Sequence, residues 1–175
     1  MISRYRVRSL LPPPRHRGVI LLVSPYSARR ESAYTKLAKL EAACRRSPAE
    51  FRSQALCSNW GPLLVSLEHH QPAECWLIAT EGDKGLAVQF APARTLLAAI
   101  SAGTRFHLET VPNPHDLGLA AAAVHRIYDG AAHGYNLDPK EVIADFTGAT
   151  AAMSGGLILA TLTEDRHLES CESHR

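Results

Sequence analysis

The stretch Val19–Val23 (VILLV) is continuously apolar, with Gly18 before it and Ser24-Pro25 after it. A short apolar run without alternating polar residues is typical of a strand that is buried on both faces. The run Cys75–Ala79 (CWLIA) has the same character. These two runs predict central strands of a parallel sheet that is covered by helices on both sides.

Helical and strand-like segments alternate along the rest of the chain. Further strands are predicted at residues 53–57, 106–111 and 142–146. Helices are predicted from the N-cap Ser32 to Ser47-Pro48 and at residues 62–70, 86–101, 117–128 and 150–162, the last interrupted by Gly155-Gly156. Strands that alternate with helices form parallel sheets, because each crossover returns the chain to the same edge. The sequence therefore predicts a single α/β domain of Rossmann-like type, with a mostly parallel sheet and helices on both faces.

The composition is that of an ordinary globular domain. The chain has 175 residues, 46% of them hydrophobic and 21% charged, and its formal net charge is +2. This length suits one domain with a sizeable core. The small net charge argues against a protein that tracks along a nucleic acid. No stretch reaches the length of a membrane span and no signal peptide is recognisable, so we expect a cytoplasmic protein.

The chain divides into three parts by composition. Residues 1–17 are a basic leader or linker with the extended run Pro12–Pro14, residues 18–163 are a ligand-binding domain, and residues 164–175 are a polar tail or a short last strand. A basic, proline-rich segment is typical of a solvated spacer. It would also suit a linker from an effector domain missing upstream, or the cytosolic part of a membrane-anchored protein.

The cysteines and histidines predict no metal site. None of the four cysteines belongs to a C-x-x-C pair. His69 and His70 are adjacent in a predicted helix and so point in different directions, and no H-E-x-x-H pattern occurs. Glu164, Asp165 and Glu169 resemble a solvated chain end, and no G-x-S-x-G elbow is present. We therefore expect no metal ion and no cofactor, no catalytic residue can be named, and the histidines are expected to be structural or solvated.

The first candidate site is the turn after the first strand. In an open α/β sheet the ligand lies outside the carboxyl ends of the strands. Ser24, Pro25, Tyr26 and Ser27 follow the Val19–Val23 strand directly. Hydroxyl groups and helix N-terminal amides suit phosphate oxygens, and a tyrosine ring can stack on a base. The alternative is that Ser27 merely caps a helix.

The second candidate site is the turn after the strand at 142–146. Thr147, Gly148, Ala149 and Thr150 lead into the last helix. Gly148 permits close backbone approach, and the threonine hydroxyls lie beside helix N–H groups, so the turn is an anion cradle built mostly from backbone. It lacks the G-K-[ST] of a phosphate-binding Walker loop and the G-x-G-x-x-G of a dinucleotide fold.

A third candidate edge follows the Cys75–Ala79 strand. Thr80 could bind a phosphate or a base, and Glu81 could accept a hydrogen bond from an adenine amino group. A polar surface loop is the equally good alternative. Asn113, after the strand at 106–111, is a similar and weaker candidate.

The late turn resembles the signature of a known family. The stretch from Asp145 to Ser154 (DFTGATAAMS) is similar to the D-x-T-G-G-T-K-x-M-S signature of CARF (CRISPR-associated Rossmann fold) domains, which also follows a late strand. The turn at Ser24 is similar to the other ligand loop of that family. The alternating pattern from about residue 18 to residue 162 fits the family fold.

This resemblance implies a homodimer that binds cyclic oligoadenylate, the second messenger of type III CRISPR antiviral defence, across its two-fold axis. Cyclic tetra-adenylate is the favoured ring. Ser24, Pro25, Tyr26 and Ser27 would hold it together with Thr147, Gly148, Ala149 and Thr150, with Thr80 and Glu81 at a further edge. Tyr26 or Met153 would face the bases.

Two positions depart from the family signature. Ala149 replaces a glycine, and Ala151 replaces the lysine that is expected to stabilise the cleavage transition state in the ring nucleases of the family. We therefore expect a sensor domain that binds without cutting. The alternatives are a metal-independent ring nuclease that cleaves by 2′-hydroxyl attack, with Arg29 or Arg30 substituting for the lysine, and an unrelated Rossmann-like protein that binds a mononucleotide.

Overall fold

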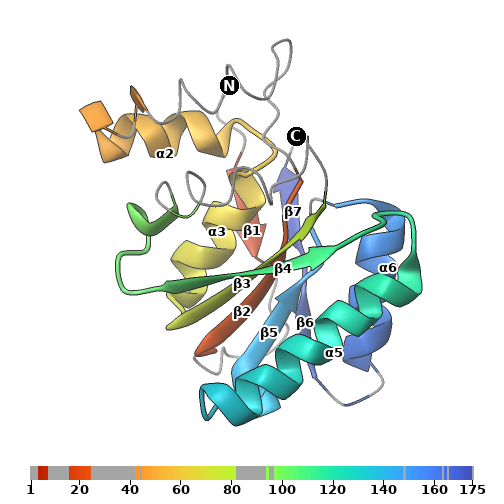
Figure 1. The fold of residues 1–175 in the computed structure, drawn as a ribbon. Helices are drawn as coiled ribbons and strands as arrows, with labels where there is room; N and C mark the ends of the chain where they lie inside the picture. Colours follow the sequence, from red (N-terminus) through yellow and green to blue (C-terminus); the bar gives the residue numbers. More distant parts are fainter. Residues whose placement is uncertain are drawn as a thin grey trace.

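A five-stranded parallel sheet lies at the centre of the computed structural model, between two layers of helices (Figure 1). The structure describes residues 4–7, 16–24, 42–43, 45–81, 94, 97–147, 149–162, 164 and 166–174. Its elements are β1 (Arg4–Val7), β2 (Gly18–Leu22), α2 (Pro48–Leu56), α3 (Gly61–His70), β3 (Glu74–Thr80), β4 (Arg105–Val111), α5 (Leu117–Gly134), the short 3-10 helix η1 (Pro139–Glu141), β5 (Val142–Asp145), α6 (Ala151–Leu162), β6 (His167–Glu169) and β7 (Cys171–His174). The expected α/β, Rossmann-like fold with a mostly parallel sheet is confirmed.

Strand β2 occupies the middle of the sheet, in the order β4-β3-β2-β5-β6. Val19 lies between Cys75 of β3 and Ile143 of β5, and every residue of β2 is buried. A strand with neighbours on both edges and helices on both faces has no position for a polar side chain. The apolar run at 19–23 is explained by this central place.

Each face of the sheet has its own apolar core. Helices α2 and α3 cover one face, where Leu21 and Leu77 pack against Leu64 of α3. Helices α5 and α6 cover the other face, where Ile20 and Ile78 belong to a second cluster. Consecutive residues of β2 and β3 therefore serve opposite cores, as the alternation of side chains along a strand requires.

Helices α5 and α6 approach each other closely at Gly156. A Cβ atom on Gly156 would lie 2.6 Å from the carbonyl oxygen of Leu117 and 2.7 Å from Cβ of Ala120. The expected interruption of the last helix at Gly155-Gly156 is wrong, because α6 runs unbroken from Ala151 to Leu162. The glycine at 156 brings the two helices together and does not break either of them.

The strand expected at 53–57 is wrong, because these residues belong mostly to α2. Ser47 is the N-cap of this helix, since its side chain accepts a hydrogen bond from Glu50 N, and Pro48 occupies the first turn. Residues 42, 43, 45 and 46 are helical, and Ser47-Pro48 follows them as the predicted end of that helix. Phe51 and Ala55 are buried, and they give the helix its inner face.

The two ends of the described chain lie side by side. Strand β1 pairs antiparallel with β7, with Arg4 opposite His174, so Arg4–Val7 of the basic leader forms a strand. Strand β6 pairs parallel with β5 and forms one edge of the main sheet. Residues 167–169 and 171–174 of the polar tail therefore form strands.

Helix α5 is longer than predicted. It begins after Asp116, whose side chain accepts a hydrogen bond from Leu119 N at 3.0 Å, and it ends at Gly134 beyond the predicted end at residue 128. Ala131 continues the buried stripe of Val124 and Ile127, which explains the extension. Of the helix predicted at 86–101, residues 94, 97 and 98 are helical, whereas residues 99–101, which are also described, form a turn, so the predicted end is too late. None of the described helices has the length and apolar character needed to cross a membrane.

Candidate functional site

The chain reverses its winding direction between β2 and β5. The strand that follows β2 lies on one side of it, at β3, whereas β5 lies on its other side. At such a switch point the two crossovers diverge and leave a crevice outside the carboxyl ends of the strands. The two turns that the sequence singled out, after β2 and after β5, flank this point.

The turn after β2 begins at Ser24, which is half-buried. Its carbonyl oxygen accepts a hydrogen bond from Nε1 of Trp60 at 3.1 Å. Trp60 is 1% exposed, so it is a core residue that fixes the exit direction of the chain from β2. Pro25, Tyr26 and Ser27 lie outside the described residues.

The turn after β5 is held by its own side chains. Asp145 is 2% exposed, and its Oδ1 accepts a hydrogen bond from Thr147 N at 2.9 Å. Ser154 Oγ donates to the carbonyl oxygen of Phe146 at 3.0 Å. These contacts tie the first turn of α6 back to the end of β5. Gly148 lies outside the described residues.

Thr150 caps α6 and joins it to a neighbouring loop. Its Oγ1 accepts a hydrogen bond from Met153 N at 3.2 Å and donates one to the carbonyl oxygen of Pro114 at 2.5 Å. Helix α6 then begins at Ala151, which is exposed. The helix N-terminus, with its partial positive charge, therefore lies at the turn that leaves β5.

We predict that Thr150→Val lowers the free energy of unfolding by about 1–2 kcal/mol, because it removes an N-cap hydrogen bond and a bond to Pro114 without changing the side-chain volume much. Chemical denaturation followed by circular dichroism measures the difference. The exposed Ser53 of α2 provides the control, and Ser53→Ala is expected to change stability by less than about 0.5 kcal/mol. An unchanged stability of Thr150→Val would contradict the capping role.

The residues of the third predicted site lie beside β4 and contact it. Thr80 ends β3 and is half-buried. Glu81 is exposed, its backbone N–H donates to the carbonyl oxygen of Val111 at 3.1 Å, and its Oε1 accepts from Thr110 Oγ1 at 3.0 Å. Asn113 uses its side chain to accept from His115 N at 3.0 Å, in the turn before α5. These residues stand at the same edge as Ser24, but their described contacts are structural.

Two candidate residues of the late turn are packed into the core. Met153 is 2% exposed and belongs to the cluster beneath α5 and α6. Ala149 is partly buried and packs against the same cluster. The expectation that Met153 faces a base does not fit this position, because a ligand at the carboxyl edge would have to displace core side chains to reach it.

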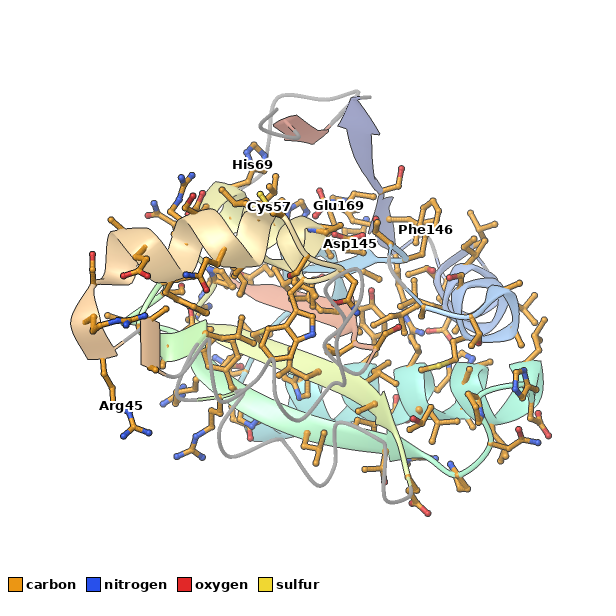
Figure 2. The ribbon with its side chains drawn as sticks, turned by 90° about the horizontal axis from the view of Figure 1, so that it is seen from above. Arg45, Cys57, His69, Asp145, Phe146 and Glu169 are labelled. Atoms are coloured by element: carbon orange, nitrogen blue, oxygen red, sulfur yellow. The ribbon has the colours of Figure 1, made fainter. Side chains whose placement is uncertain are left out.

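A buried polar cluster, which the sequence did not reveal, joins α3 to the edge strand β6. Ser66 Oγ donates to Glu169 Oε1 at 2.9 Å, and His70 Nε2 lies 2.8 Å from the same oxygen. His16 Nε2 lies 2.6 Å from His167 Nδ1. We call these five residues the His16–Glu169 cluster. Figure 2 shows Glu169 close to Asp145, its register partner on β5.

Both ends of this cluster carry a polar atom without a partner. His16 Nδ1 and Glu169 Oε2 are buried and find no hydrogen-bond partner within the described part of the chain. The expectation that Glu169 is solvated is wrong, since its side chain is only 3% exposed. A cavity of about 480 Å³ lies beside the cluster, lined by His16, Arg17, His69, His70, Gln71 and Ala73.

The surroundings of His16 disfavour its charged form. Burial, together with the neighbouring His70 and His167 imidazoles, lowers the pKa of His16 from its ordinary 6.5 to about 4. Among the described residues, no three His, Cys, Asp or Glu side chains converge as ligands of a metal ion. The cluster therefore packs His16, in its neutral form, among two further imidazole rings and the buried carboxyl group of Glu169. A strand of three residues is too short to display an alternating pattern, so its buried side could not be inferred from sequence.

Comparison with known proteins adds no relative to this picture. No protein-family model matches the chain, and no curated protein matches it. A function for this chain must therefore be inferred from the geometry of the site and from the residues of the two turns.

Proposed function

We propose that this chain binds cyclic oligoadenylate across a homodimer, as a sensor domain of the CARF type. The observation that carries the proposal is the position of the two polar turns. Ser24 at the end of β2 and the Asp145–Ser154 segment after β5 flank the switch point of the sheet, where α/β folds bind nucleotides.

The chemistry of the late turn suits a phosphate ligand. Helix α6 directs its N-terminus to this edge, and the contacts of Asp145, Thr150 and Ser154 tie the described residues of the turn to the end of β5 and to the first turn of α6. A preformed backbone cradle binds an anion with little ordering entropy. Three residues that match the CARF signature thus have roles in shaping the loop, which supports the resemblance.

The absence of a lysine supports sensing over cleavage. Ala151 is the first residue of α6, and its methyl group supplies no charge for a transition state. A cyclic ligand with a two-fold axis requires a symmetric pair of sites, so the proposal includes a homodimer.

The proposal predicts a thermal shift with cyclic tetra-adenylate. At a concentration of about 100 times Kd the ligand stabilises the folded state by about 2.7 kcal/mol, which corresponds to a rise in Tm of roughly 5–10 °C. The measurement is differential scanning fluorimetry, with chromatography of the nucleotide after incubation and light scattering for the oligomeric state. The expected result is a raised Tm, an intact ring and a dimer.

Two variants sharpen this test. Thr147→Val removes a hydroxyl group from the late turn and should reduce the shift, whereas Ser53→Ala on α2 should leave it unchanged.

Linear products would identify a ring nuclease that works without the lysine. A shift with AMP but with neither cyclic tetra- nor cyclic hexa-adenylate would identify a mononucleotide-binding protein, and no shift with any of them would refute the proposal.

A further inference from the structure

A second polar cluster lies at the amino ends of β3 and β4. The two candidate ligand turns lie at the other end of the strands. Glu74 and Arg105 are the first residues of these strands and lie opposite each other, and Trp76 lies opposite His107 in the same register. Tyr135 directly follows α5, which packs on this part of β4. None of these residues takes part in the site proposed above.

Glu74 fixes the tautomer of His107. The side chain of Glu74 is only 3% exposed, and its Oε2 lies 2.7 Å from His107 Nε2. Burial acts to raise the pKa of Glu74, but hydrogen bonds from Arg105 and His107 outweigh it, so the pKa is lowered and the group is a carboxylate. A carboxylate only accepts hydrogen bonds, so the proton of a neutral His107 resides on Nε2.

The other ring nitrogen of His107 faces a phenol. With the proton on Nε2, Nδ1 carries a lone pair, and the hydroxyl group of Tyr135 lies 3.3 Å from it. The two rings are tilted with their centroids 4.8 Å apart, so the phenol has to turn before its O–H points along the Nδ1 lone pair, as catalytic hydrogen bonds often do only when substrate is bound. Carboxylate, imidazole and hydroxyl stand in the same order as in a nucleophile–base–orienter triad, whose apo distances are often somewhat long.

Aromatic packing holds the three groups in place. The Trp76 and His107 rings are stacked with their centroids 5.3 Å apart, and Tyr135 meets Trp76 edge-on at 5.7 Å. Trp76 is 6% exposed, whereas Tyr135 is 37% exposed. The base is thus supported by a buried ring, and the phenol is within reach of a reactant in solvent.

The carboxylate of Glu74 also anchors a cation, Arg105. Arg105 donates through Nε to Glu74 Oε1 at 2.8 Å, and its side chain is 71% exposed. The hydrogen bond and charge of Glu74, with a smaller contribution from Tyr135, raise the pKa of Arg105, so it is always charged. An exposed guanidinium anchored on one side suits phosphate oxygens on the other.

We propose that Tyr135 is a nucleophile for phosphoryl groups, with His107 as its general base, Glu74 as the residue that orients His107, and Arg105 as the cation that binds the phosphoryl oxygens. The substrate class is a phosphate or phosphonate ester, anhydride or fluoride with a good leaving group. This inference is independent of the nucleotide site.

The step is a single substitution at phosphorus. The Tyr135 oxygen forms a bond to phosphorus while the bond from phosphorus to the leaving group breaks, and the leaving group departs with its electron pair. The phenol proton moves to His107 Nδ1, and Glu74 stabilises the imidazolium that results. The product is a tyrosine phosphoester or phosphonoester.

A fluorophosphonate probe tests the proposal directly, because fluoride is the leaving group and the adduct is stable enough for mass spectrometry. The four other tyrosines are internal controls: Tyr5, Tyr26, Tyr34 and Tyr128. We expect Tyr135 to be labelled about 100-fold faster than any of them, within the range that a positioned general base provides. Equal labelling of the five tyrosines would overturn the proposal.

Variants separate reactivity from packing. His107→Gln keeps a donor for Glu74 but removes the base, and it should slow labelling of Tyr135 by about 100-fold. His133→Gln, at an exposed position in the last turn of α5, should have no effect. Tyr135→Phe should keep the Tm and lose the adduct. Unchanged labelling of His107→Gln would show that His107 serves packing only.

A measurement on the unmodified protein covers the case in which His107→Gln does not fold. If His107 takes the proton as the bond to phosphorus forms, labelling of Tyr135 is slower in D2O than in H2O. A rate that is the same in both solvents would exclude the proposed proton transfer.

Discussion

Gly156→Ala is expected to lower the free energy of unfolding by about 2–3 kcal/mol, as overpacking of a tight contact does. The added methyl group would meet backbone atoms of α5, namely the Leu117 carbonyl oxygen at 2.6 Å and Ala121 N at 2.9 Å. Backbone cannot rotate away as a side-chain end can, so the two helices must separate. This loss outweighs the gain of up to about 1 kcal/mol that alanine brings to a helix interior.

Gly130→Ala provides the matched control for this prediction. Gly130 lies within α5 and is exposed, and nothing lies within 4 Å of an added Cβ atom. We expect this variant to be more stable by up to about 1 kcal/mol, since only the helix propensity changes. Urea denaturation of both variants measures the contrast. If Gly156→Ala were as stable as Gly130→Ala, the close approach of α5 and α6 would be disproved.

The second large effect is a loss of stability in mild acid that depends on His16. In the folded protein its pKa is about 4, whereas in the unfolded chain it returns to 6.5. Between these values the unfolded chain binds a proton that the folded protein does not, so the stabilisation is complete above pH 6.5 and is lost as the pH falls toward 4. This difference in pKa corresponds to about 3 kcal/mol in the free energy of unfolding.

The titratable side chains around His16 contribute to its low pKa. His69 and His70 of α3 and His167 of β6 disfavour a charge on it, and Glu169 opposes them. The measurement is the free energy of unfolding of the wild type and of His16→Leu between pH 4 and pH 7.5. The variant should show a pH dependence that is smaller by about 3 kcal/mol. His115→Gln, at an exposed position, should follow the wild-type curve.

Sequence patterns predicted the elements whose burial is regular. Strand β2 and the stretch Cys75–Ala79 of β3 are apolar because both faces are covered, and the buried residues of α6 recur at helical spacing. Residues 53–57 were assigned to the wrong class because a five-residue window has no reliable period. Only the capping contact of Ser47 with Glu50 marks that segment as helix.

The two polar clusters could not be predicted from the sequence. The His16–Glu169 cluster combines side chains of α3 and β6 with His16, which lies two residues before β2, and the group Glu74, His107 and Tyr135 combines β3, β4 and the residue after α5. Neither cluster lies within one segment of the sequence, because the fold brings residues of distant elements together. The two candidate turns could be chosen from the sequence because each directly follows a buried strand, and that rule needs only the order of elements.

The central place of β2 also affects how the chain must fold as it leaves the ribosome. Strand β2 ends at Leu22, but β5, which covers one of its edges, begins at Val142. At the usual rate of synthesis, about 5–20 residues per second, the intervening chain takes on the order of ten seconds to emerge. During that time the most apolar strand has an unpaired edge, which is the kind of surface that chaperones bind. Nascent-chain folding and aggregation should therefore depend on the speed of translation through the second half of the message.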